Sequence, residues 1–124
     1  MTATKVVDAS ALAALLFGEP EAEAVAAWLD GARLVAPSLL PFELANVCLV
    51  KCRRHSDQRE ALFAGLGLCS RLGVEEIAVD QAGIVELASE TGLTAYGASY
   101  LWLARRLGAE LVTLDKALEA AARP

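Results

Sequence analysis

The sequence predicts an α/β protein with three layers, in which helices cover both faces of a short and mostly parallel central sheet. Short β-branched or apolar runs alternate with longer helical patterns along the chain, and glycine or proline separates most of them. This alternation is typical of βαβ units, whose strands run parallel and whose helices pack on the sheet. The 124 residues contain no evident linker or repeat, so we expect residues 1–124 to form a single domain.

Most predicted elements have a recognisable start or stop signal. Gly18 and Pro20 end the first helix, and acidic residues favour the first turn of the second. Pro37 ends the second strand, and Pro41 is tolerated because it falls in the first turn of the long helix. The predicted strands span residues 4–7, 33–36, 74–79 and 111–114. The predicted helices span residues 11–17, 21–29, 39–54, 57–72, 81–89, 95–107 and 116–122.

The composition favours a compact protein of the cytoplasm that does not enter a membrane. Hydrophobic residues make up 56% of the chain, but the longest uncharged apolar run, from Ala9 to Phe17, is about half the length that crosses a bilayer. Three cysteines are an odd number for a disulfide scaffold and indicate a reducing compartment. The net charge of -5 gives no hint of nucleic-acid binding by itself, although carboxylates gathered around a metal also make a chain acidic.

Two aspartates directly follow predicted strands. Asp8 comes after the first strand and Asp115 after the last one. Ligands of open parallel sheets bind beyond the carboxyl ends of the strands, so both side chains point into one crevice if these two strands are neighbours. A helix N-cap is the simpler interpretation of either aspartate alone. Ser10 and Thr113 each lie two residues from one of them, and their hydroxyls can hold a carboxylate or a bound water, or serve as an ordinary cap and strand residue.

Glu43 interrupts what looks like the buried face of the long helix. Its neighbours at helical spacing are mostly apolar, which predicts that the carboxylate is buried with them; they are Leu39, Leu40, Asn46, Val47 and Val50. A buried carboxylate needs a partner charge, a metal or a proton, and no Lys or Arg shares the first turns of this face. A metal is the economical explanation, with Asn46 as an orienting hydrogen-bond partner. A partly exposed glutamate at the helix start is the alternative.

Asp8, Glu43 and Asp115 therefore predict one acidic pocket for a divalent cation. Carboxylate oxygens without histidine or cysteine suit Mg²⁺ or Mn²⁺, and such ions typically support hydrolysis of phosphate esters. A phospho-accepting receiver domain is disfavoured because it needs an acidic pair after the first strand. Cys48, Cys52 and His55 share a helix face and suggest zinc, but they lack the usual knuckle spacing, and buried helical cysteines are common.

Four segments resemble PIN-domain ribonucleases, and most closely the VapC-type toxins of bacterial toxin–antitoxin pairs. The segments lie in the family's order and at its usual spacing, and they cover essentially the whole chain. They are VVDASALAALLFGE (residues 6–19), APSLLPFELANV (36–47), LTAYGASYLWLA (93–104) and LVTLDKAL (111–118). The resemblance implies a PIN-like fold, Mg²⁺- or Mn²⁺-dependent hydrolysis of RNA, a homodimer, and inhibition by a small antitoxin protein.

By position, the resemblance makes Asp8, Glu43 and Asp115 the metal-binding and catalytic acids of the family. It gives the supporting polar positions to Ser10, Asn46 and Thr113.

The chain departs from the family at Gly97, where the family's helix usually carries an acid. Thr94 is the expected N-cap of this helix, which places residue 97 at the third helical position, where an acidic side chain completes a capping box. Three interpretations stay open. The site works with three acids and water, the chain is a weakened or inactive relative that still binds an antitoxin, or the glycine was introduced when a toxic enzyme was cloned.

Overall fold

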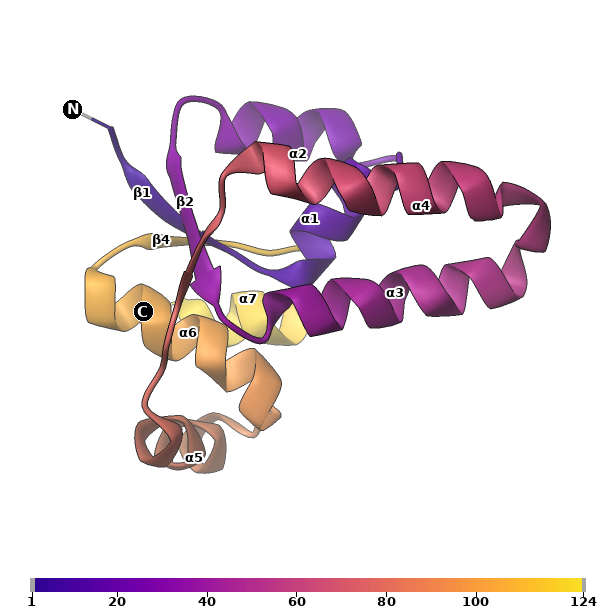
Figure 1. Cartoon of the computed structure of the whole chain (residues 1–124). Coiled ribbons are helices and arrows are strands. Elements are labelled where there is room, and N and C mark those ends of the chain that lie inside the picture. The colour runs from indigo at the N-terminus through magenta and orange to yellow at the C-terminus, as the bar shows by residue number, and fades with distance from the viewer. Residues whose placement is uncertain (1, 124) are drawn as a thin grey trace.

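The computed structural model describes residues 2–123, which form one sheet with helices on both of its faces (Figure 1). The strands are β1 (Thr4–Val7), β2 (Arg33–Pro37), β3 (Glu75–Ile77) and β4 (Glu110–Val112). The helices are α1 (Ala9–Leu16), α2 (Ala22–Leu29), α3 (Leu40–Arg54), α4 (Arg59–Gly67), α5 (Gln81–Thr91), α6 (Ala95–Leu107) and α7 (Lys116–Ala122). The predicted α/β fold with its three layers is confirmed.

The sheet places the ends of β1 and β4 side by side. Its strand order is β3-β2-β1-β4, and all three pairs are parallel. Val7 pairs with Val112, so the residues that follow them, Asp8 and Thr113, leave the sheet at the same edge. The condition on which the sequence argument for a shared crevice depended is therefore met.

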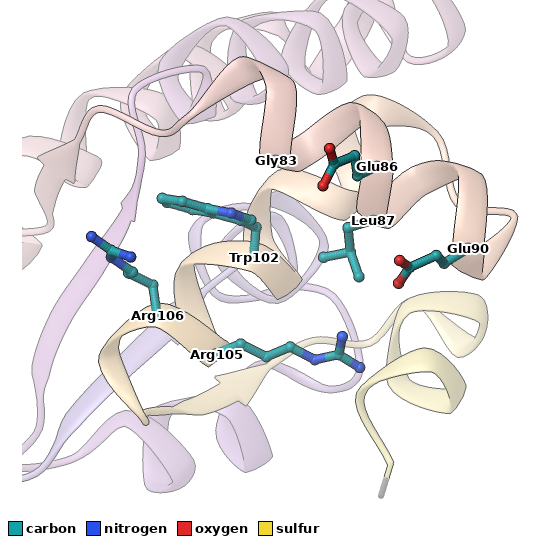
Figure 2. A pocket seen from close by; sticks show the side chains of 7 residues that line it. All are labelled: Gly83, Glu86, Leu87, Glu90, Trp102, Arg105 and Arg106. Carbon is teal, nitrogen blue, oxygen red and sulfur yellow. The ribbon is translucent and has the colours of Figure 1, made fainter.

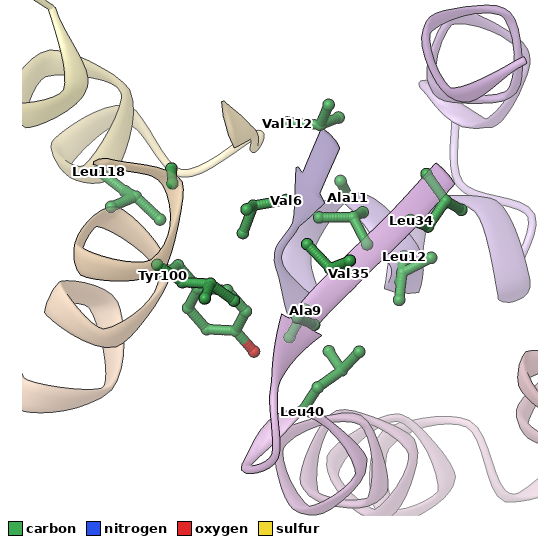
Figure 3. Close-up of a cluster of buried hydrophobic side chains, with 14 of the residues drawn as sticks. Val6, Ala9, Ala11, Leu12, Leu34, Val35, Leu40, Tyr100, Val112 and Leu118 are labelled. Carbon is green, nitrogen blue, oxygen red and sulfur yellow. The ribbon is translucent and has the colours of Figure 1, made fainter. Parts of the chain in front are cut away.

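The hydrophobic core lies on both sides of β1 and β2. Figure 3 shows Tyr100 and Leu118 on one side of these strands and Leu12 and Leu34 on the other. Val6, Val35 and Val112 of the central strands are fully buried between the two sets. Burial on both faces explains why the strand segments are almost uniformly apolar, as parallel strands usually are.

Helices α3 and α4 form an antiparallel hairpin that extends away from the sheet (Figure 1). Cys48, Cys52 and Leu62 form a small buried cluster between them. The single helix predicted over residues 57–72 is wrong in extent, because α4 is flanked by the short 3-10 helices Ser56–Gln58 and Leu68–Leu72. The second of these ends at Gly73, which has a φ of 65°. Within residues 2–123, no helix is both long and apolar enough to cross a membrane.

Gly65 allows α4 to approach the end of α1, so we expect Gly65→Ala to destabilise the protein. A Cβ at this position would lie 2.4 Å from the backbone oxygen of Leu16, which cannot move aside as a flexible side chain can. Overpacking of this kind costs about 1–3 kcal/mol. Gly67→Ala is the matched control, because no atom lies within 4 Å of the added Cβ. Urea unfolding measures both variants, and equal midpoints would contradict the prediction.

Candidate functional site

Asp8 is held rigidly at the carboxyl end of β1. It is 4% exposed and caps α1, with its Oδ1 accepting from the Ala11 amide at 3.0 Å and from the Ser10 hydroxyl at 2.7 Å. Its Oδ2 accepts from the Thr113 hydroxyl at 2.5 Å. The N-cap interpretation of Asp8 is therefore correct, but a cap alone does not need three donors. The side chain therefore both caps α1 and provides a carboxylate of fixed orientation where β1 and β4 end side by side.

Thr113 and Ser10 join the two aspartate-bearing loops. The Asp115 amide donates to Thr113 Oγ1 at 3.0 Å, while the Leu114 amide donates to Ser10 Oγ at 3.0 Å. Asp115 itself is exposed and caps α7 through the Leu118 amide, which donates to Asp115 Oδ1 at 3.0 Å. The structure thus places both hydroxyls where the sequence suggested, between the carboxylates and the backbone that carries them.

Glu43 is oriented by Tyr100 rather than by Asn46. The Tyr100 hydroxyl donates to Glu43 Oε1 at 2.5 Å, which ties the first turn of α3 to α6. Asn46 is exposed, although it lines the same hollow as Glu43. Tyr100 was not among the site residues predicted from the sequence, yet a signal was present: a tyrosine in a buried helical face needs a partner for its hydroxyl.

The buried face of α3 differs from the one predicted. Leu40, Leu44, Cys48 and Cys52 make the buried ridge, and Glu43 lies half-buried beside it. Val50, which we expected to be buried, is 37% exposed. The true ridge is displaced by one position from the predicted one, and adjacent positions on a helix lie about 100° apart. Glu43 is thus at the margin of the core, where a carboxylate can meet both a buried partner and a ligand.

Asp8 is close enough to both other acids for their negative charges to repel. Burial raises the pKa of Asp8, and the hydrogen bonds from Thr113, Ala11 and Ser10 only partly oppose this effect, while Asp115 adds to it. Burial also raises the pKa of Glu43, against the hydrogen bond from Tyr100, and the charge of Asp8 raises it further. These mutual effects show that Asp8 has Glu43 and Asp115 as electrostatic neighbours. A cation among them would relieve the repulsion.

The donor set fits a hard divalent cation in an open site. Hydrogen bonds within residues 2–123 occupy one carboxylate oxygen of Glu43 and one of Asp115, which leaves the other oxygen of each free to bind a cation. All the atoms that could act as metal ligands in this group are oxygens. No group of three or more His, Cys, Asp or Glu side chains in this part of the chain is close enough to hold an ion. The three carboxylates therefore do not by themselves form a group able to hold an ion. Mg²⁺ typically binds one or two carboxylates and completes its shell with water and substrate phosphate.

Gly97 lies on the helix that carries Tyr100, the partner of Glu43, and has room for a side chain. Thr94 caps α6 as predicted, because its hydroxyl accepts from the Gly97 amide at 3.1 Å. Gly97 is three residues before Tyr100, and this spacing places two residues on one helix face. A Cβ at Gly97 would meet Thr94 Oγ1 at 3.5 Å and Leu93 Cβ at 3.9 Å, which are ordinary contacts. Neither backbone nor packing requires a glycine here.

A zinc site in α3 is not formed. Cys48 and Cys52 are buried against Leu62, whereas His55 is exposed at the end of the helix. Within residues 2–123 these side chains do not form a group able to hold a metal. The two cysteines are core residues.

A second hollow lies between α5 and α6 and is lined by both acidic and basic side chains. Figure 2 shows Glu86 and Glu90 on α5 and Arg105 and Arg106 on α6 around this hollow, with Arg106 extending away from the two glutamates beside Trp102. The guanidinium of Arg106 lies 5.9 Å from the centre of the Trp102 ring. This hollow shares no residue with the acidic group and has balanced charges, so it is not part of the candidate site.

Comparison with known proteins agrees with this geometry. Residues 5–124 match the PIN domain family. The chain belongs to the PIN domain family. This PIN domain is 34% identical over 118 residues to Ribonuclease VapC3 from Pyrobaculum aerophilum, covering 91% of this chain and 90% of that protein. It also resembles the crystal structure of PAE2754 from Pyrobaculum aerophilum, with a TM-score of 0.79, 27% identity, and coverage of 99% and 87% of the two chains. The resemblance to VapC-type PIN domains is confirmed.

The raised pKa of Asp8 predicts how the stability of the metal-free PIN domain depends on pH. Below about pH 4 the carboxyl is protonated in both states, and its contribution to stability is fully present. As pH rises toward the higher pKa of the folded state, the unfolded chain ionises first, so that contribution is lost. We expect the free energy of unfolding of the wild type, relative to Asp8→Asn, to fall as the pH rises above about 4. Urea unfolding in EDTA tests this, and a relative rise with pH would contradict it.

Proposed function

We propose that this PIN domain is a VapC-type endoribonuclease that hydrolyses RNA with Mg²⁺ or Mn²⁺ held by acidic residues. The observation that carries the proposal is the position of Asp8, a nearly buried carboxylate fixed by three donors where β1 and β4 end together. A side chain that served only to cap α1 would not need Ser10 and Thr113 as well. The name of the relative, Ribonuclease VapC3, supports the same activity.

Each acidic residue has a distinct part in this proposal. Asp8, directly after β1, and Asp115, three residues after the end of β4, would bind the cation, and Glu43 would hold it or its bound water from α3. Ser10 and Thr113 keep the Asp8 carboxylate in one orientation, and Tyr100 does the same for Glu43. The cation, when bound, lowers the pKa of a water molecule and neutralises phosphate charge. Without it the same carboxylates would repel an RNA phosphate.

The proposed biological setting is a type II toxin–antitoxin pair in the cytoplasm. In this setting the chain forms a homodimer, acts on RNA, and is inhibited by a small antitoxin protein. The name of the relative supports the RNA substrate and the antitoxin.

The proposal is tested by incubating the purified chain with a mixed-sequence RNA in Mn²⁺, in Mg²⁺ and in EDTA. We expect cleavage at internal positions with either cation and none in EDTA. Restoring Mn²⁺ after EDTA should restore cleavage. Cleavage that persists in EDTA would assign the activity to a contaminating metal-independent nuclease and overturn the proposal.

A second function is favoured by Gly97. In place of the family's usual acid this position offers no ligand, so the chain would be an antitoxin-binding module with little or no nuclease activity. Its acidic hollow would then accept a basic side chain of the antitoxin. The Gly97→Asp experiment in the Discussion separates this module from a working enzyme.

A further inference from the structure

A hollow beside Glu43 has two aromatic side chains that are exposed to solvent. It has a volume of about 430 Å³ and is lined by Ala9, Leu39, Phe42, Glu43, Asn46, Val47 and Tyr96. Phe42 is 79% exposed and Tyr96 is 65% exposed, although rings of this size dominate the buried surface of most proteins. Phe42 belongs to the first turn of α3 and Tyr96 to the first turn of α6, so two separate helices supply the rings.

The chemistry of this hollow matches a nucleobase. A base has two π faces that stack on aromatic rings and an edge that hydrogen-bonds to amides. Phe42 and Tyr96 supply the rings, and the Asn46 amide both donates and accepts. Glu43 lines the same hollow, together with Ala9, which directly follows Asp8. The stacking surface is therefore continuous with the place where a phosphate is proposed to react.

We propose that Phe42 and Tyr96 form a stacking platform for the base adjacent to the phosphate that is cleaved, with Asn46 contacting the edge of that base. This inference rests on the proposed RNA substrate. The platform gives the site a base preference that the carboxylates cannot supply, because phosphate is the same in every nucleotide.

A neutral base suits this hollow better than a second copy of the chain. A second copy carries the same net charge of -5 and would bring its own acids toward Glu43, a carboxylate that lines the hollow. Charged groups are depleted at the centres of protein interfaces. A nucleotide brings one phosphate, which a divalent cation can neutralise.

The platform is tested with Phe42→Leu and Tyr96→Leu, which keep an apolar side chain but remove the ring. Phe63→Leu is the matched control, because Phe63 is another exposed aromatic, 51% exposed, on α4 rather than in this hollow. The probes are fluorescein-labelled RNA hexamers, one intact and six with a single abasic nucleotide at successive positions. Dissociation constants are measured by fluorescence anisotropy in Ca²⁺, which also takes oxygen ligands. Sedimentation of each variant reports its oligomeric state.

Stacking of one base contributes enough for about a tenfold weaker affinity when the ring is removed. We expect Phe42→Leu and Tyr96→Leu to bind the intact hexamer about tenfold more weakly than wild type does. At one abasic position the variants and the wild type should bind equally, because the stacking partner is already missing. Phe63→Leu should match the wild type on every hexamer.

Three results overturn the platform. In the first, the variants bind every hexamer as tightly as the wild type does. In the second, they lose the same affinity for the intact hexamer and for all the abasic hexamers. In the third, they lose affinity only because a dimer dissociates. The last result would make this surface an interface between copies. If the wild type cleaves RNA but shows one of these results, only the platform fails. If the wild type neither cleaves nor binds any RNA, the proposed function fails together with it.

Discussion

Asp8→Asn is expected to reduce Mn²⁺-dependent RNA cleavage by more than about a hundredfold, because even residues that only orient metal ligands contribute about 10–100-fold. Asparagine has the same shape and can still accept from Ser10 and the Ala11 amide, so the end of β1 should remain in place. What the substitution removes is the negative charge that binds the cation. Initial cleavage rates of wild type and variant over a range of Mn²⁺ concentrations measure the effect.

The thermal stability of Asp8→Asn distinguishes a binding carboxylate from a structural one. Burial and the nearby Asp115 raise the pKa of Asp8, so the ionised side chain destabilises the metal-free fold at neutral pH. We therefore expect Asp8→Asn to unfold in EDTA at the same temperature as the wild type or a higher one. Glu86→Gln removes one charge from an exposed residue of the separate hollow on α5 and should retain full activity. A variant that loses activity by unfolding would show a lower melting temperature.

The sheet edge was predictable from the sequence because strand ends leave a clear local signal. A β-branched run followed by an acid appears at Asp8, and a second acid follows the last strand at Asp115. If these two strands are parallel neighbours, both acids lie at the same edge of the sheet, and β1 does lie beside β4. Ser10 and Thr113 were singled out because each lies two residues from one of these aspartates.

The environment of Glu43 was less predictable, because the apolar residues of α3 do not all face the core. Val50 and Phe42 are apolar yet exposed, and helical periodicity alone cannot separate an exposed apolar stripe from a buried one. The partner of Glu43 was missed for another reason. Tyr100 is 57 residues away, and that contact depends on how α6 packs against α3 rather than on any local pattern.

Gly97→Asp is expected to raise Mn²⁺-dependent cleavage by about 10–100-fold, the range that supporting residues of metal sites usually contribute. The new carboxylate would extend from the first turn of α6 on the face that carries Tyr100, whose hydroxyl contacts Glu43. The space around Gly97 accepts a Cβ without a clash. Cleavage rates and calorimetric titration with Mn²⁺ should both respond, since the substitution adds a ligand or orients a bound water.

Two control variants separate charge from helix stability at this position. Gly97→Ala improves helix propensity by about 1 kcal/mol without adding a ligand, and Gly97→Asn adds a side chain of similar shape without charge. Only Gly97→Asp should combine faster cleavage with tighter Mn²⁺ binding. In the metal-free state its capping-box gain opposes repulsion from Glu43 and Asp8, so its melting temperature should change little without Mn²⁺ and rise when Mn²⁺ is added. Equal and measurable cleavage by Gly97→Asp and wild type would show that the other three acids already suffice and that position 97 does not limit the chemistry, whereas no cleavage by either protein would favour the binding module.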